Sequence, residues 1–230
     1  MLGNHSGHSI RRTMTDVVVD HISTQIRDGV YKIGDKLPNE DELALEIGVG
    51  RSSVREGMKV LKVYGVVEIR QGGGTFVTDN VAEHMFDFLW FMSGSTYLNF
   101  LEFRRVIEVG AIVEIYDKLQ EKDFEELQKL VDCMVYGHSL DDLVQADHDF
   151  HHKLNCFNNN PLNEQIEKML YQVRIDSLYK VLCRAEDVEI TRAAHQRILD
   201  ALRARDLAEC IDAVLSHLDY TITNIKRDTA

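Results

Sequence analysis

The strongest constraint on the fold is a run of local signals between residues 38 and 77. The segment PNEDELALEIG has a capping residue, Asn39, followed three residues later by Glu42, and it ends at Gly48. This pattern is typical of a helix that begins with a capping box and ends at a glycine. After a short turn, RSSVREGMKVLKVYG has helical periodicity, and VVEIR, QGGG and TFV then predict a β-hairpin with a glycine-rich tip. Helix, turn, helix and hairpin in this order predict a winged helix-turn-helix.

The net charge of the chain is −12, but the acidic residues are not spread evenly. Residues 81–230 carry 16 Lys and Arg against 27 Asp and Glu, whereas residues 1–80 carry 10 against 11. The second predicted helix has a basic stripe, formed by Arg51, Arg55, Lys59 and Lys62. A local stripe of this kind is enough for phosphate contacts, so the acidic total does not exclude nucleic acid as a partner.

The run from Gly29 to Val77 resembles the N-terminal DNA-binding domain of the GntR family of bacterial transcription regulators. It contains the LP-E motif, the helix turn, the VRE motif and the G-G-TFV wing without a gap. The resemblance implies that Arg51 and Arg55 contact double-stranded DNA. Arginines at i and i+4 share one helix face, and each guanidinium can fork to a guanine edge or a phosphate. The helix start and the wing tip supply the remaining candidate DNA contacts: Ser52, Ser53, Gln71 and Gly72.

Several positions depart from the usual pattern of this family. Asp41 stands where many members have an arginine, so we expect one DNA contact to be missing. Asn39 replaces a common serine without consequence, because both residues cap helices. Gly50 and Gly57 stand where serine and alanine are common. A glycine inside a helix costs about 1 kcal/mol relative to alanine, so we expect a locally softer recognition helix.

The cysteines and the apolar pattern favour a soluble cytoplasmic protein. The four cysteines lie 23 to 27 residues apart and form no CxxC pair, which argues against a disulfide framework or a thiolate zinc site. No apolar run approaches the roughly 20 residues of a membrane span, and the N-terminus lacks the apolar core of a secretory signal. We expect a flexible tail over residues 1–12, a winged helix-turn-helix domain over 13–79 and a second domain over 80–230.

The second predicted domain is helical almost without interruption. AEHMFDFLWFM and LNFLEFRRVIEVGAIVEIYDKL are strongly apolar on one side. Further helical patterns cover residues 124–134, 140–155, 162–182, 188–203 and 207–227. Together they predict an all-α antiparallel bundle of six or seven helices.

Four ionisable residues fall on apolar faces of these helices. Asp147 and His151 lie one turn apart among apolar residues, and His195 and His217 hold similar positions on two later helices. The neighbouring pair, His148 and His152, falls on a polar face that we expect to be exposed. Burying an uncompensated carboxylate costs several kcal/mol, which a divalent cation would offset. A lone inward histidine is more often a hydrogen-bonded core residue. The residues alone therefore leave both readings open, because a sequence does not show whether helices converge.

This region is also similar to the metal-binding subset of the FCD domain, the ligand-binding domain of the FadR subfamily. The similarity rests on D-H-D-F-H, on H-Q-R-I-L-D-A-L and on a histidine late in the last helix. It implies that one divalent metal is bound by Asp147, His151, His195 and His217. The metal of the family is typically zinc, with nickel or another transition metal as alternatives. The resemblance further implies one or two open coordination positions for a small carboxylate effector.

The run LEFRRVIE matches the E-x-R-x-x-x-E pattern of the same subfamily. The match implies that Arg104 faces the cavity and binds an acid group of the effector bidentately. The alternative is a structural salt bridge to Glu108 at i+4. Asn155 and Arg174 are further candidates for effector binding.

The leading functional hypothesis is a homodimeric transcription regulator. Two recognition helices related by a twofold axis would read a short palindromic operator, and a small organic acid at the metal would control the affinity for DNA. The alternative is a metalloenzyme for small acids or esters with a DNA-binding appendage, since a metal with an open position can activate water. Against it, no inward acid, base or nucleophile is evident beside the ligands. A purely structural metal is a third possibility.

Overall fold

The computed structural model describes residues 12–94, 96–135 and 137–228. These residues form two compact units, which divide between Met85 and Phe86. The tail predicted over residues 1–12 lies, apart from Arg12, outside the described residues. None of the described helices is long and apolar enough to cross a membrane.

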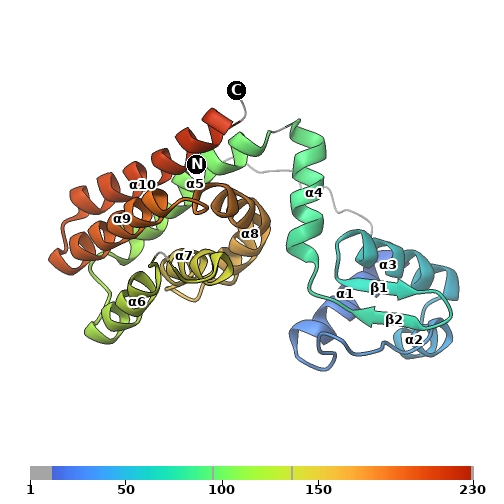
Figure 1. Ribbon diagram of the computed structural model, residues 1–230. Helices are drawn as coiled ribbons and strands as arrows, with labels where there is room; N and C mark the ends of the chain where they lie inside the picture. Colours follow the sequence, from blue (N-terminus) through green and yellow to red (C-terminus); the bar gives the residue numbers. More distant parts are fainter. Residues whose placement is uncertain (1–11, 95, 136, 229–230) are drawn as a thin grey trace, which may run out of the picture. The chain divides into compact units, whose positions relative to one another are not determined.

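The first unit is the predicted winged helix-turn-helix (Figure 1). Its elements are α1 (Met14–Arg27), α2 (Glu40–Ile47), α3 (Arg51–Val63) and the antiparallel strands β1 (Val67–Arg70) and β2 (Gly74–Val77). The capping box of α2 is confirmed, because the Asn39 side chain accepts from the N–H of Glu42 and the Glu42 carboxylate accepts from the N–H of Asn39. Gly48 has φ +75°, a left-handed conformation that glycine adopts without strain, and it ends α2.

A small apolar core joins the three helices to the hairpin. Its buried side chains are Val18, Ile22, Leu37, Leu43, Val54, Met58, Leu61, Val67 and Val77. Gly57 of α3 faces α1 directly, because a Cβ atom at this position would lie 2.6 Å from Cγ1 of Val18. The glycine therefore allows a close approach of two helices, which its sequence context does not indicate.

The second unit is all-α, as predicted. The helix α4 (Val81–Ser93) precedes six further helices: α5 (Tyr97–Ile115), α6 (Glu121–Cys133), α7 (Leu140–Asn155), α8 (Pro161–Val181), α9 (Ala185–Ala204) and α10 (Leu207–Asp228). α10 packs against α5, α8 and α9, while α7 packs against α5, α6 and α8. α7 has the bounds that the sequence pattern predicts, and the others differ from theirs by a few residues.

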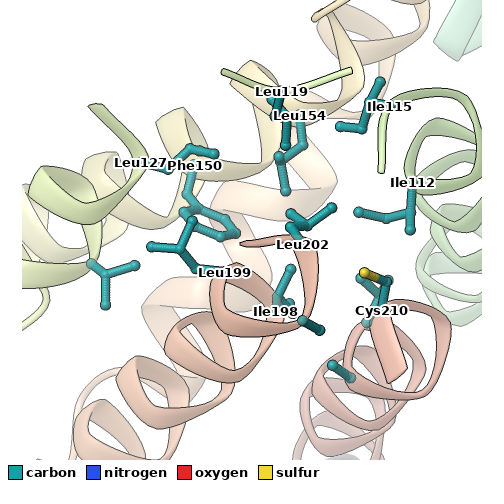
Figure 2. Packing of buried hydrophobic residues seen from close by; sticks show 14 of the residues in the cluster. Ile112, Ile115, Leu119, Leu127, Phe150, Leu154, Ile198, Leu199, Leu202 and Cys210 are labelled. Atoms are coloured by element: carbon teal, nitrogen blue, oxygen red, sulfur yellow. The ribbon is translucent and has the colours of Figure 1, made fainter. Parts of the chain in front are cut away.

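Apolar side chains from α5, α6, α7, α9 and α10 pack into one core (Figure 2). Phe150 of α7 and Ile198 of α9 are fully buried within this core, and Ile112 of α5 and Leu127 of α6 contribute from the neighbouring helices. Phe150 directly precedes His151, and Ile198 lies three residues after His195. The packing that fixes α7 against α9 therefore also fixes the two histidines.

Candidate metal centre and DNA-binding surface

The four predicted metal ligands converge inside the second unit. One ligand atom from each of Asp147, His151, His195 and His217 lies within 4.8 Å of the others. His151 Nε2 lies 3.1 Å from His217 Nε2 and 3.2 Å from His195 Nε2. His195 Nε2 in turn lies 3.2 Å from Oδ1 of Asp147. α7, α9 and α10 supply these residues, and none is more than 3% exposed.

The surroundings of two histidines leave their Nε2 atoms without protons. Nδ1 of His195 lies 2.7 Å from the backbone oxygen of Thr191, and Nδ1 of His151 lies 2.8 Å from Oε2 of Glu108. An acceptor beside Nδ1 keeps the proton of a neutral imidazole on that nitrogen, so Nε2 presents a lone pair. Two lone pairs thus face each other beside a carboxylate, an arrangement that a cation would stabilise. Carboxylates and carbonyls in these positions are the usual partners of metal-binding histidines.

The carboxylate of Asp147 is fully buried. Neither of its oxygens accepts a hydrogen bond from the described residues. Burial raises the pKa of Asp147, but the imidazoles of His195, His151 and His217 outweigh burial and lower the pKa. Burial also lowers the pKa of His217 well below its ordinary value and lowers that of His151. An ionised carboxylate and neutral imidazoles are the states that bind metal, so this set of three nitrogens and one carboxylate fits a divalent transition metal.

A network of buried charges adjoins the four ligands. Arg104 Nη2 lies 2.8 Å from Oε1 of Glu108, and Arg174 Nη2 lies 3.4 Å from Glu108 and 3.1 Å from Glu167. Asn155 Nδ2 donates to Oε1 of Glu167 at 2.7 Å. Burial raises the pKa of Glu108, but Arg104, His151 and Arg174 hold that pKa well below the ordinary value. The three candidate effector residues therefore lie in one network, and Glu108 joins it to His151.

The sequence left two roles open for Arg104, effector binding and a structural salt bridge to Glu108, and the salt bridge is present. A role of Arg104 in effector binding stays a prediction. Sequence reasoning treated Glu108 only as this partner and missed its contact with His151. It also missed Glu167, although Glu167, Leu170 and Arg174 share one buried face of α8 at helical spacing.

The expectation that His148 is exposed is wrong. His148 is half-buried, and its ring meets the edge of Tyr171 with 4.8 Å between ring centroids. Burial lowers the pKa of His148 to about 4. The reason is that α8 packs over the polar face of α7. His152, one turn further on, is partly exposed, with 39% of its side chain accessible.

The predicted DNA-contacting arginines lie on the exposed side of α3, and each is paired with an acid of α2. Arg51 Nε lies 2.5 Å from Oδ1 of Asp41, and Arg55 Nη2 lies 2.7 Å from Oε2 of Glu40. The hydrogen bond between Arg55 and Glu40 raises the pKa of Arg55 and lowers the pKa of Glu40. Asp41, which stands where we expect a basic DNA contact to be missing, is thus also an ion-pair partner of Arg51.

The other predicted DNA-binding residues are accessible at two places on the first unit. Ser52 is exposed and Ser53 partly exposed in the first turn of α3. Gln71 and Gly72 are both exposed in the turn between β1 and β2, where Gly72 has φ +72°. A backbone without a side chain at this tip allows close approach to a DNA groove.

Two family models match the chain, one within each of the two units. Residues 14–77 match the bacterial regulatory proteins of the gntR family, and residues 99–220 match the FCD domain. The HTH-type transcriptional regulator YcbG of Bacillus subtilis is 29% identical over 213 residues, which cover 91% of this chain and 89% of that protein. The HTH-type transcriptional repressor NanR of Enterobacter is 28% identical over 226 residues, with 91% and 84% covered.

A solved structure of a Streptococcus agalactiae GntR protein has the same fold. It superposes with a TM-score of 0.66 at 24% identity and covers 93% of this chain and 99% of its own. The curated relatives are named as transcriptional regulators, which speaks against the metalloenzyme alternative. The chain belongs to the GntR family of bacterial regulatory proteins and is a DNA-binding transcription regulator with a C-terminal FCD domain.

Proposed function

We propose that this regulator binds a short palindromic operator as a homodimer, and that a small organic acid bound beside a divalent metal in the FCD domain controls its affinity for DNA. The observation that carries the proposal is the buried Asp147 carboxylate, which accepts no hydrogen bond from the described residues and lies among three converging imidazoles. The metal would be held by Asp147, His151, His195 and His217. When bound, it would supply Lewis-acid coordination for one carboxylate oxygen of the effector.

The formal charges of the buried network favour an anionic effector. Asp147, Glu108 and Glu167 are acids, whereas Arg104 and Arg174 are the buried bases beside them. The five side chains together carry one net negative charge when all are ionised. A divalent metal turns this into one net positive charge, which the carboxylate of a monoacid neutralises. Buried charges are stable when they are compensated in this way.

Arg174 has the free donors that such an effector needs. Its Nε and Nη1 atoms are buried and have no hydrogen-bond partner among the described residues. A planar guanidinium with unused donors is suited to bidentate contact with a carboxylate. The amide of Asn155 and the Arg104 guanidinium supply further polar groups in the same network. A small carboxylate with a hydroxyl group would use both kinds of partner.

Exposed apolar side chains support the homodimer. Large side chains on α4 and α5 face solvent, among them Phe88, Phe91, Met92, Phe103 and Val106. Phe91 is 83% exposed and Val106 is 67% exposed. Large apolar side chains exposed in this number are typical of a surface that another chain covers, and a second copy provides the twofold symmetry that a palindrome requires. Because one relative is named a repressor, we propose repression in the cytoplasm that the effector relieves.

The test combines mass measurement with DNA binding. Native mass spectrometry of the wild-type protein should show a dimer with metal in each chain, and His195→Ala should lose that metal. His138→Ala, an exposed histidine of the same unit, is the matched control. Operator DNA selected from a random duplex pool then allows fluorescence anisotropy against a panel of small carboxylates.

Three outcomes are informative. Weaker DNA binding with one class of acid, lost in His195→Ala, supports the proposal. A metal-bearing dimer whose DNA affinity no acid changes would make the metal structural. A metal-free dimer after incubation with zinc and with nickel contradicts the metal centre itself.

A further inference from the structure

A second group of metal-binding side chains lies on the opposite side of α7 from the first. His152 and Cys156 are one turn apart at the end of α7, and Glu164 is in the first turn of α8. One ligand atom from each lies within 4.8 Å of the others. Cys156 Sγ is 3.7 Å from His152 Nδ1, and His152 Nε2 is 3.8 Å from Oε2 of Glu164.

We propose that His152, Cys156 and Glu164 form a second metal site that binds zinc or a similar divalent transition metal. Imidazole, thiolate and carboxylate are all zinc ligands, and a thiolate disfavours magnesium and calcium. Zinc bonds of about 2.0 to 2.3 Å in tetrahedral geometry place neighbouring ligand atoms about 3.3 to 3.6 Å apart. One ligand atom from each residue lies within 4.8 Å of the others, a limit wider than this spacing. Rotation of the His152 and Glu164 side chains, which are 39% and 42% exposed, would bring one imidazole nitrogen and one carboxylate oxygen closer to the thiolate.

The site opens into a surface groove, which gives an ion access. The groove has a volume of about 820 Å³, and all three residues line it. Its lysines are matched by an equal number of acids, Asp123, Glu126, Asp149 and Glu164. One of the lysines, Lys153, is paired with Glu126. The groove therefore does not repel a cation, and water or a small anion from it can complete the coordination.

Two simpler roles fit the group less well. At 3.8 Å the contact between His152 and Glu164 is too long for a hydrogen bond. An oxidation-sensing cysteine needs a stabilised thiolate and exposure, whereas Cys156 is buried, and its burial and the nearby carboxylates raise its pKa to about 12. A metal ion displaces the thiol proton and then uses the same carboxylate as a ligand.

A bound metal ion would cross-link the end of α7 to the start of α8 and so hold the short loop between them. The spacing of the cysteines along the sequence gave no sign of this site. Cysteine spacing along the sequence reveals sites built from cysteine pairs, whereas here a single cysteine lies beside a histidine and a glutamate. The last residue of α7, Asn155, precedes Cys156 and contacts Glu167 of α8. Occupancy of the second site thus fixes a segment that also belongs to the proposed effector network.

The experiment uses cobalt as the probe, on metal-free, reduced full-length protein. Thiolate coordination to Co²⁺ produces an intense near-ultraviolet charge-transfer band, which the nitrogen and oxygen ligands of the first site cannot produce. We expect this band in the wild type and in the controls Cys133→Ser and Cys183→Ser, whose cysteines are exposed. Cys156→Ser should abolish it, and the protein should bind one cobalt ion fewer per chain.

His152→Ala is the second variant, because a partly exposed side chain can be removed without unfolding the domain. It should weaken the cobalt affinity measured from the band by at least tenfold, and Glu164→Gln should act in the same direction. A wild type without the band in excess cobalt overturns the proposal, as does a band that survives in His152→Ala at unchanged affinity. These readouts involve neither DNA nor effector, so they are independent of the proposed function.

Discussion

Nδ1 of His151 lies 2.8 Å from one oxygen of Glu108, while the other oxygen of this carboxylate accepts from Arg104. A single buried side chain thus links an imidazole of the proposed metal site to an arginine of the proposed effector site. The geometry makes Glu108 the group that sets the orientation of His151, although it binds no metal itself.

Glu108→Gln should therefore weaken metal binding at the first site by about 10- to 100-fold, because carboxylates behind ligating histidines have effects of this size. Competition of the protein with a chromogenic chelator measures the affinity. Glu102→Gln on the same helix, whose partner is the exposed Lys226, is the control. Equal affinities for the two variants would show that Glu108 does not orient the ligand.

Removal of metal from the first site should destabilise the FCD domain. Zinc at a hundred times its Kd stabilises a folded protein by about 2.7 kcal/mol, which for a chain of this size raises Tm by about 5 to 10 °C. Thermal unfolding with zinc or with a chelator tests this in a Cys156→Ser background, where the second site is absent. The same rise in a protein that also carries His195→Ala would contradict the assignment.

Arg174→Met should abolish the response to the effector and lower stability. Breaking a buried charge pair costs about 3 to 5 kcal/mol, because the partner acid is left without compensation. The double variant Arg174→Met, Glu167→Leu removes both partners and should recover much of the stability. If it also recovers effector-controlled DNA binding, Arg174 has only a structural role.

Gly57→Ala should destabilise the first unit, although alanine is the better helix former by about 1 kcal/mol. The added Cβ would meet two atoms of the stiff Val18 side chain at 2.6 and 2.9 Å, and overpacking of this kind costs about 1 to 3 kcal/mol. Urea unfolding measures the change in the free energy of unfolding. Gly50→Ala, whose Cβ would meet only Ser52 Oγ at 3.7 Å, should have the smaller effect. A more stable Gly57→Ala protein would mean that α1 moves aside easily.

Asp41→Arg should increase the affinity for DNA severalfold and steepen its dependence on salt by about one unit of slope, since it adds one phosphate contact and releases Arg51. Anisotropy titrations over a range of salt concentrations measure both quantities. Asp35→Asn removes an acid elsewhere in the same unit and serves as the control. Unchanged affinity in Asp41→Arg would place this position outside the DNA contact.

Local signals made the winged helix-turn-helix predictable from the sequence. The Asn39 capping box, the left-handed Gly48 and the glycine-rich hairpin tip each depend on residues a few positions apart. Helical periodicity also placed Asp147, His151, His195 and His217 on buried faces, because inward positions follow from spacing along one helix.

Contacts between helices were beyond such reasoning. The packing of α8 over His148, the contact of Glu108 with His151 and the position of Glu167 all join residues distant along the chain. The pairing of Arg51 with Asp41 and the fit of Gly57 on Val18 belong to the same class. Periodicity shows which side of a helix faces inward, whereas it gives no information on which side chain will meet it there.

The two acid-paired arginines of α3 have a consequence for how the regulator searches a genome. Each must leave a carboxylate before it can contact a phosphate, so binding to arbitrary DNA is an exchange of partners that returns little free energy. The operator offers base contacts in addition, and the free energy of these contacts is not reduced by the loss of an ion pair. A genome presents about 10⁶ to 10⁹ competing sites. We therefore expect the pairs to shorten the residence time at each of these sites and to sharpen discrimination at the cost of absolute affinity.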